Sequence, residues 1–140
     1  HVGTLIGHSP WKTISQDMIQ AFADATGDHQ WIHVDVERAG RDTPWGSTVA
    51  HGFLTVSLIP VLNQAIFRVT GTSATINYGL NNLRFPAVVR AGSAIRSRVT
   101  LDDVSTVDEK RTLAVFSTRI EIQGEEKPAC VAESLVMYLS

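Results

Sequence analysis

A carboxylate and an imidazole lie close together in one short segment of the sequence. Residues 25–35 read ATGDHQWIHVD and place Asp28 and His33 five positions apart, just after a predicted helix. An extended or turning backbone would bring both groups to one water molecule. Burial and mutual interaction can move the pKa values of such a pair toward neutrality, which suits general acid–base catalysis. The alternative is that Asp28 caps a turn and His33 is an ordinary loop histidine.

A glycine begins the apolar segment that follows. Residues 48–54 read TVAHGFL, with Gly52 at the expected start of a helix. Helix N-termini expose unpaired N–H groups, so the Gly52 N–H could stabilise an oxygen that becomes negative during a reaction. A glycine would also let a substrate approach closely. The alternative is that Gly52 only allows the chain to turn tightly into the helix. The neighbouring His51 is interpreted as a structural contact at the start of the helix.

Two segments must position these groups. Residues 15–26 are predicted to form a helix that is capped by Ser15, carries an apolar face and ends near Gly27. Residues 28–45 lack sustained periodicity and are predicted to be a long loop. Within that loop, Asp35 is interpreted as the cap of a short helical turn over residues 36–39 rather than as a catalytic group.

The segment from Phe53 to Phe67 has apolar residues around most of its helical circumference. Such a helix is predicted to be buried, and it is too short to span a bilayer. Pro60 should kink this helix or end its first half.

The second half of the sequence changes to β-prone segments. Strands are predicted over residues 75–85, 94–103, 111–123 and 129–139. Residues 102–111 and 124–128 are predicted to connect neighbouring strands, and both are too short for a crossover helix, so the strands should be antiparallel. A buried helix laid against a curved antiparallel sheet, an α+β class, is therefore expected.

The composition of the chain limits the kinds of partner that it is expected to bind. The 140 residues carry a formal net charge of −2, are 44% hydrophobic and are predicted to form one domain over residues 1–140. No basic excess indicates nucleic-acid binding. One cysteine, Cys130, cannot form an intramolecular disulfide, and no run resembles a leader or a membrane span, which favours a cytoplasmic setting. No metal-ligand pattern or phosphate-binding glycine motif predicts a metal or a cofactor.

The two polar segments together resemble the signature of a known family. The MaoC-like hydratases carry approximately Gly-Asp-x-Asn-Pro-x-His followed downstream by Ala-His-Gly. The matching residues are Gly27, Asp28, His33, Ala50, His51 and Gly52. The resemblance extends through residues 77–80 (NYGL), 84–86 (RFP) and 127–130 (KPAC). Within the family, the sequence resembles the NodN-type branch in particular.

This resemblance implies a single hot-dog domain, in which a curved sheet wraps a long buried helix, and a homodimer whose subunits together form the active clefts. It implies an acyl-CoA thioester substrate and an (R)-specific enoyl-CoA hydratase, a hydro-lyase that adds water to trans-2-enoyl-CoA. Asp28 and His33 would then handle the water, and the Gly52 N–H would bind the thioester oxyanion. The alternatives are an acyl-CoA thioesterase and a noncatalytic acyl-thioester binding module.

The sequence departs from the family signature at two positions. Gln30 and Trp31 replace the Asn and Pro of many hydratases. Gln30 is expected to orient the site with a longer reach, and Trp31 to shape the mouth or the acyl pocket. Arg84 is the preferred contact for CoA phosphates, whereas Arg96 and Arg98 are interpreted as a solvated strand face.

Overall fold

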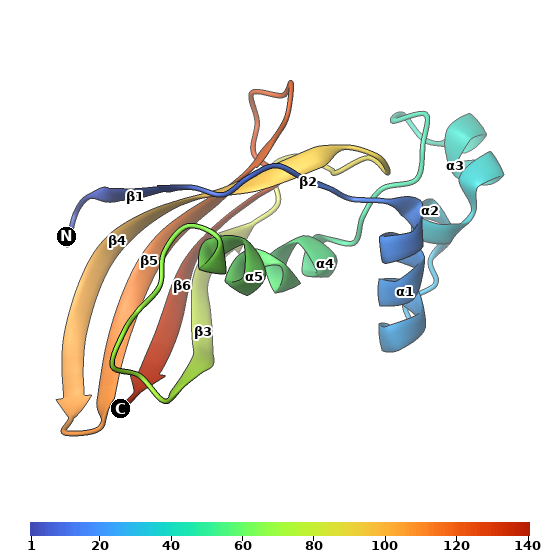
Figure 1. Ribbon diagram of the computed structural model, residues 1–140. Helices are drawn as coiled ribbons and strands as arrows, with labels where there is room; N and C mark the ends of the chain where they lie inside the picture. The colour runs from blue at the N-terminus through green and yellow to red at the C-terminus, as the bar shows by residue number, and fades with distance from the viewer.

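One curved antiparallel sheet forms the framework of the molecule, with the central helices on its concave side (Figure 1). A computed structural model describes residues 1–140. The strands run in the order β1-β4-β5-β6-β3, and β2 pairs separately with β4. Their bounds are Leu5–His8 (β1), Lys12–Thr13 (β2), Ala74–Arg84 (β3), Ala94–Asp108 (β4), Arg111–Ile122 (β5) and Cys130–Leu139 (β6). The predicted α+β class is confirmed.

The long strands differ from their predicted bounds mainly in β4. The polar stretch that begins at Asp102 was expected to connect two strands, yet β4 continues to Asp108 and pairs with β5 almost to the turn. A register shift between Leu101 and Asp103 marks a bulge in this extension. Cross-strand pairing with β5 outweighs the low β-propensity of the polar residues there, so the predicted connection was too long. Strands β1 and β2 are short and were not predicted.

Helix α1 (Gln16–Thr26) confirms its sequence prediction. The Ser15 hydroxyl oxygen accepts a hydrogen bond from the Met18 N–H at 3.1 Å, which is an N-cap. At the other end Gly27 has φ 83°, the left-handed conformation that a side chain would disfavour. The helix buries Ile19 and Ala23. The cap and the glycine therefore determine where the chain leaves the helix, immediately before Asp28.

The predicted loop after α1 contains two short helices. They are α2 (Trp31–Val34) and α3 (Val36–Asp42). The Asp35 carboxylate accepts a hydrogen bond from the Arg38 N–H at 3.1 Å, which confirms Asp35 as a cap. Helices α1, α2 and α3 lie together beyond one end of the sheet (Figure 1).

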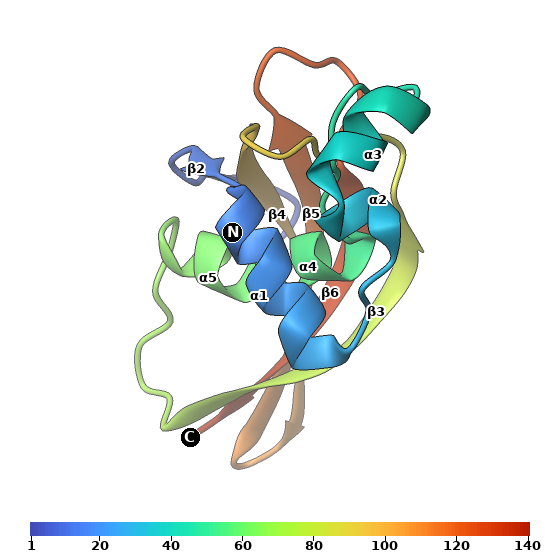
Figure 2. The same cartoon turned by 90° about the vertical axis from the view of Figure 1, so that its right-hand side faces the viewer.

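The apolar central segment lies on the concave face of the sheet as two helices, α4 (Gly52–Ser57) and α5 (Ile59–Gln64), instead of one long helix (Figure 2). The interruption falls at Leu58, and Pro60 in the first turn of α5 has no N–H to donate to the preceding helix. The predicted break at Pro60 is thus confirmed. Burial on all sides is not observed, because the side chains of Phe53 and Val61 are 70% and 51% exposed.

The main core lies between the sheet and helices α1, α4 and α5. Twelve buried residues form it: Ile14, Ile19, Ala50, Leu54, Ile59, Leu62, Val89, Ile95, Ile120, Ile122, Ala129 and Cys130. Burial raises the pKa of the Cys130 thiol to about 11, so this side chain is neutral and acts as a small core residue. No helix in the structure combines the length and apolar character needed to cross a membrane.

Candidate active site

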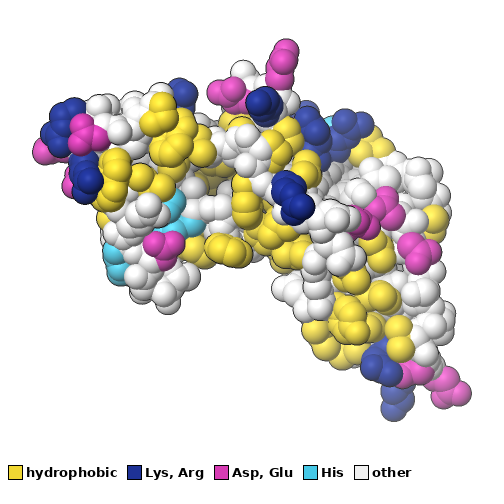
Figure 3. Space-filling model, turned by 180° about the vertical axis from the view of Figure 1, so that it is seen from behind, with side chains coloured by type: hydrophobic (Ala, Val, Ile, Leu, Met, Phe, Trp, Pro, Cys, Tyr) yellow, Lys and Arg dark blue, Asp and Glu magenta, His cyan; other side chains and the backbone are white.

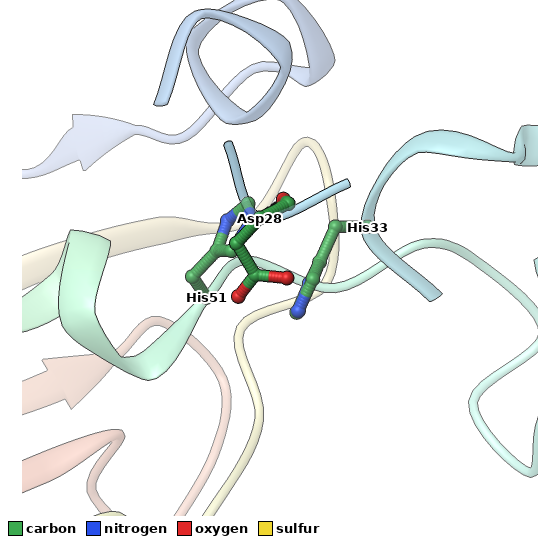
Figure 4. A group of neighbouring side chains, drawn as sticks. All are labelled: Asp28, His33 and His51. Atoms are coloured by element: carbon green, nitrogen blue, oxygen red, sulfur yellow. Dashed lines mark hydrogen bonds between the residues drawn. The ribbon is translucent and has the colours of Figure 1, made fainter. Parts of the chain in front are cut away.

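Backbone and side-chain hydrogen bonds join the two polar segments that the sequence singled out. The Val49 N–H donates to the Ile32 carbonyl at 3.0 Å. His33 Nδ1 donates to the Val49 carbonyl oxygen at 2.6 Å, and His51 Nε2 donates to the Asp28 carbonyl oxygen at 3.0 Å. Residues from α2 and from the approach to α4 therefore meet at one place (Figure 4).

A further polar pair, which the sequence analysis missed, braces this junction. Gln16 Nε2 in the first turn of α1 donates to the His33 carbonyl oxygen at 2.8 Å, and the Thr48 hydroxyl donates to Gln16 Oε1. The Gln16 amide thus ties α1 to both segments at once. A glutamine at the start of a helix is usually a surface residue, so no local pattern marks it.

His33 is a buried imidazole with a defined tautomer. Its side chain is only 7% exposed. Because a carbonyl oxygen can only accept, the bond to Val49 requires a proton on Nδ1 and leaves Nε2 unprotonated in the neutral ring. Burial lowers the pKa of His33 and His51 adds to the lowering, while the hydrogen bond to the Val49 carbonyl and the Asp28 charge oppose this shift without cancelling it. The ring is therefore neutral at pH 7 and able to accept a proton.

His51 does more than mark the start of α4. Its ring is 3% exposed and stacks on His33, with ring centroids 3.7 Å apart and an interplanar angle of 22°. Phe22 of α1 packs on it with a centroid separation of 4.9 Å. Because Nε2 donates to Asp28, the neutral ring has its unprotonated nitrogen at Nδ1, which is buried and has no hydrogen-bond partner. His51 therefore holds the backbone of Asp28 and the ring of His33 together.

Asp28 presents its carboxylate at this junction. The side chain follows Gly27, is exposed, and accepts a hydrogen bond from the Gln30 N–H at 3.4 Å. Figure 4 shows the carboxylate directed toward the His33 ring. One polar atom from each of Asp28, His33 and His51 lies within 4.8 Å of the others. Carboxylate and imidazole are also ligands of transition metals, so these three side chains could hold a cation as well as exchange protons.

Gly52 begins α4 beside this cluster. Its N–H donates to no protein acceptor. A Cβ placed on Gly52 would lie 3.1 Å from three ring atoms of Phe85, closer than ordinary van der Waals contact. The glycine was expected to leave room for a substrate, whereas here the space on that side of Gly52 is occupied by the Phe85 ring. The unpaired N–H itself agrees with an oxyanion-binding role.

The three predicted substrate contacts lie less centrally. Gln30 is exposed and shapes the turn through its backbone, since its carbonyl accepts from the His33 N–H at 3.0 Å. Trp31 is covered by the Arg38 guanidinium, whose carbon lies 3.9 Å from the ring centroid. Arg84 is exposed at the end of β3 and donates to the Leu83 carbonyl oxygen at 2.7 Å. The structure connects none of these side chains directly to Asp28 or His33.

A pocket of about 770 Å³ lies between the central helices and strands β3 and β6. Residues that line it include Val56, Pro60, Asn63, Leu80, Ser134 and Tyr138. Val56 is four residues after Gly52 and therefore shares its face of α4. No local sequence pattern predicts this pocket, because its walls come from distant segments. A space-filling view of the molecule from behind shows histidine side chains beside an acidic side chain, with hydrophobic side chains close to them (Figure 3).

Comparison with known proteins places these observations in a family. Residues 1–122 match the family described as MaoC like domain. The chain is 49% identical to 3-hydroxyacyl-thioester dehydratase Z of Mycobacterium tuberculosis over 99% of this chain and 91% of that protein. It is 42% identical to Nodulation protein N of Rhizobium meliloti, over 94% and 82% of the two chains.

A solved structure agrees with this placement. The (R)-hydratase from A. caviae involved in PHA biosynthesis superposes with a TM-score of 0.77 and 26% identity, over 97% of this chain and 95% of that one. The family match over most of the chain and the identity to these relatives lead to one conclusion: the chain belongs to the MaoC-like domain family, with the hot-dog fold of its structural neighbours.

Proposed function

We propose that the chain is an (R)-specific enoyl-CoA hydratase, a hydro-lyase that reversibly adds water to trans-2-enoyl-CoA to give (R)-3-hydroxyacyl-CoA. The observation that carries this proposal is the neutral, buried His33 ring beside the Asp28 carboxylate, close to the start of α4 with its unpaired Gly52 N–H. The names of the dehydratase and the (R)-hydratase among its relatives support the same reaction. These names favour a hydratase over a thioesterase or a noncatalytic binding module.

The chemistry uses one water molecule and no external reagent. Asp28 and His33 Nε2 hold the water, and the pair takes a proton from it as its oxygen forms a bond to C3. The C2–C3 π electrons move toward the thioester carbonyl, and the Gly52 N–H stabilises the enolate oxygen. When the carbonyl re-forms, C2 takes a proton from the same pair. Because the two groups share protons as a coupled pair, the role of base belongs to the pair and not to one residue.

The remaining contacts follow from the position of the thioester at Gly52. The acyl chain would run along the face of α4 that carries Val56 and enter the adjoining pocket. Arg84 precedes Phe85, whose ring packs on Gly52, so the exposed guanidinium could reach a CoA phosphate. Gln30 would hold the turn that presents Asp28, and Trp31 would border the mouth of the site.

Incubation with crotonyl-CoA and longer trans-2-enoyl-CoAs tests the function directly. We expect loss of the absorbance of the conjugated thioester and formation of the 3-hydroxyacyl-CoA. Release of CoA thiol without hydration would instead identify a thioesterase, and binding without turnover would identify a noncatalytic module. Since the proposed scheme moves only protons, a chelator should leave the rate unchanged, and inhibition by the chelator would contradict it.

The pH dependence of hydration should report on His33. Because its pKa is lowered from 6.5, the ring keeps its neutral, proton-accepting form at pH 7 and loses it only as the pH falls below 6.5. We therefore expect kcat/KM to be constant near neutrality and to decline on the acid side through an apparent pKa below 6.5. A pH–rate profile for one enoyl-CoA measures it. A decline centred above that value would contradict a buried, neutral His33.

The chain is also proposed to form a homodimer. Strand β3 pairs only with β6, and its other edge is open. Ile76 and Tyr78 on this strand are 47% and 62% exposed, and an open edge of this length is usually covered by another chain. Sedimentation should give twice the mass of one chain, and a fully active monomer would contradict this proposal. The cytoplasmic setting stays a prediction.

A further inference from the structure

The proposed acyl pocket contains polar groups that have no protein partner. Asn63 of α5 lines it and is 8% exposed. Asn63 Oδ1 accepts a hydrogen bond from the buried Ser97 hydroxyl at 2.6 Å, which fixes the amide plane, while Asn63 Nδ2 makes no hydrogen bond to the protein. Ser134 of β6 lines the same pocket, is 5% exposed, and its hydroxyl oxygen is buried without a partner. Two walls of the pocket therefore hold unpaired polar atoms.

These atoms make the pocket poorly matched to a plain hydrocarbon chain. An alkyl chain that filled it would remove water from the Asn63 amide and offer no acceptor in return, and unpaired buried polar groups are unfavourable. The hydroxyl of nearby Ser57 is different, because it already donates to the Leu54 carbonyl oxygen at 2.7 Å. Asn63 and Ser134 are the buried polar residues of this pocket, and each has a polar side-chain atom without a protein partner.

Resting on the proposed hydratase function, we propose that the substrate is an enoyl thioester whose acyl chain carries an oxygen, a hydroxyl or a carbonyl, in its distal part. The Asn63 Nδ2–H donates to this oxygen, and the Ser134 hydroxyl lies in the same polar environment. An oxygen on the chain replaces the water that the chain displaces, so the Asn63 amide remains hydrogen-bonded in the complex. Asn63 is accordingly a specificity-determining residue.

The spacing along the central helices indicates where the oxygen lies. Gly52 begins α4 and Asn63 lies near the end of α5, eleven residues further along the chain. The break at Leu58 can only shorten the path, so at the usual rise per residue Asn63 is no more than about 16 Å from Gly52. An acyl chain that begins with its thioester at Gly52 therefore meets Asn63 well beyond its reactive C2–C3 bond, in the middle or at the end of a medium-length chain.

Paired substrates test the proposal. A medium-chain trans-2-enoyl-CoA is compared with analogues of equal length that carry a hydroxyl at successive distal carbons, and kcat/KM is measured for each. We expect the native chain to prefer one hydroxylated analogue over the plain chain by about fivefold to tenfold, the scale of one net hydrogen bond. In Asn63→Leu the preference should disappear or reverse, with most of the change in KM.

Two further variants make the result interpretable. Asn63→Leu leaves the Ser97 hydroxyl unpaired, so the double variant Asn63→Leu/Ser97→Ala, which removes both partners, is measured if the single variant does not fold. Thr118→Val removes another buried, unpaired hydroxyl that does not line this pocket, and it should keep the native preference. Loss of the preference in Thr118→Val as well would show a general packing effect and overturn the assignment to Asn63.

The outcomes separate this inference from the function on which it rests. No hydration of any enoyl-CoA would reject the proposed function. Efficient hydration of plain chains, with no gain from a hydroxyl at any position and no change in Asn63→Leu, would preserve the function and reject the inference. A preference for short unsubstituted chains over every hydroxylated one would reject it as well.

Discussion

Asp28→Asn and His33→Ala are each expected to lower hydratase turnover by at least about a hundredfold, the scale of acid–base catalysis by one positioned group. Asp28 is exposed, so its change to the isosteric amide should leave the fold intact. In the proposed mechanism both groups act on the same water, so each is of little use without the other. The double variant should therefore resemble the slower single variant instead of multiplying the two losses. Turnover of purified variants, with circular dichroism as the folding check, measures this.

His29→Ala is the matched control for these variants. This imidazole lies in the same segment, but its side chain is 48% exposed and its Nε2 contacts Asp24 at 2.8 Å on the surface of α1. Its removal should leave kcat within about twofold, since surface changes away from the chemistry have small effects. Near-native turnover in folded Asp28→Asn or His33→Ala would refute the assignment, as would an equal loss in His29→Ala.

The second large effect is on the stereochemistry of the product. We expect nearly all of it to be the (R)-3-hydroxyacyl thioester, formed by syn addition of water. Asp28 and His33 lie together at one junction, and a thioester held at the Gly52 N–H presents one face to them. In the proposed mechanism the pair activates the water whose oxygen bonds to C3, and the same pair gives the proton to C2. Reaction in deuterated water, with NMR for the relative configuration and chiral analysis for the absolute one, reads out both properties.

Two different results would carry different meanings. A predominantly (S) product would reject the proposed function. An (R) product formed by anti addition would keep the function but show that a group outside the Asp28/His33 pair delivers the proton to C2. In that case His51, whose Nδ1 is unpaired beside His33, is the next group to test, with His51→Gln as the first variant.

Local patterns in the sequence were enough to predict much of the fold. Ser15 and Gly27 marked the limits of α1, Pro60 marked a break in the central helix, and β-prone composition marked the long strands. Each of these signals acts over a few neighbouring residues, through a cap, a missing N–H or the β-propensity of a segment. The extension of β4 past Asp102 was missed because its stability comes from pairing with β5, which local composition does not report.

The candidate site shows the same division. Asp28, His33 and Gly52 could be selected from the sequence because a signature places their residue types at recognisable spacings. The stacking of His51 on His33, the brace formed by Gln16 and Thr48, and the packing of Phe85 on Gly52 could not. Each of these contacts joins segments that are distant in the chain, and only the folded arrangement makes them neighbours.

The sequence by itself thus determined the residue types available for acid–base chemistry and the elements that carry them. Tertiary structure decided which nitrogen of His33 carries the proton, because the Val49 carbonyl lies beside Nδ1, and it lowered the pKa of that ring by burying it. It also formed the pocket in which Asn63 Nδ2 has no partner. Tautomer, pKa and pocket shape all depend on distances between groups far apart in the chain, and those distances exist only once the chain has folded.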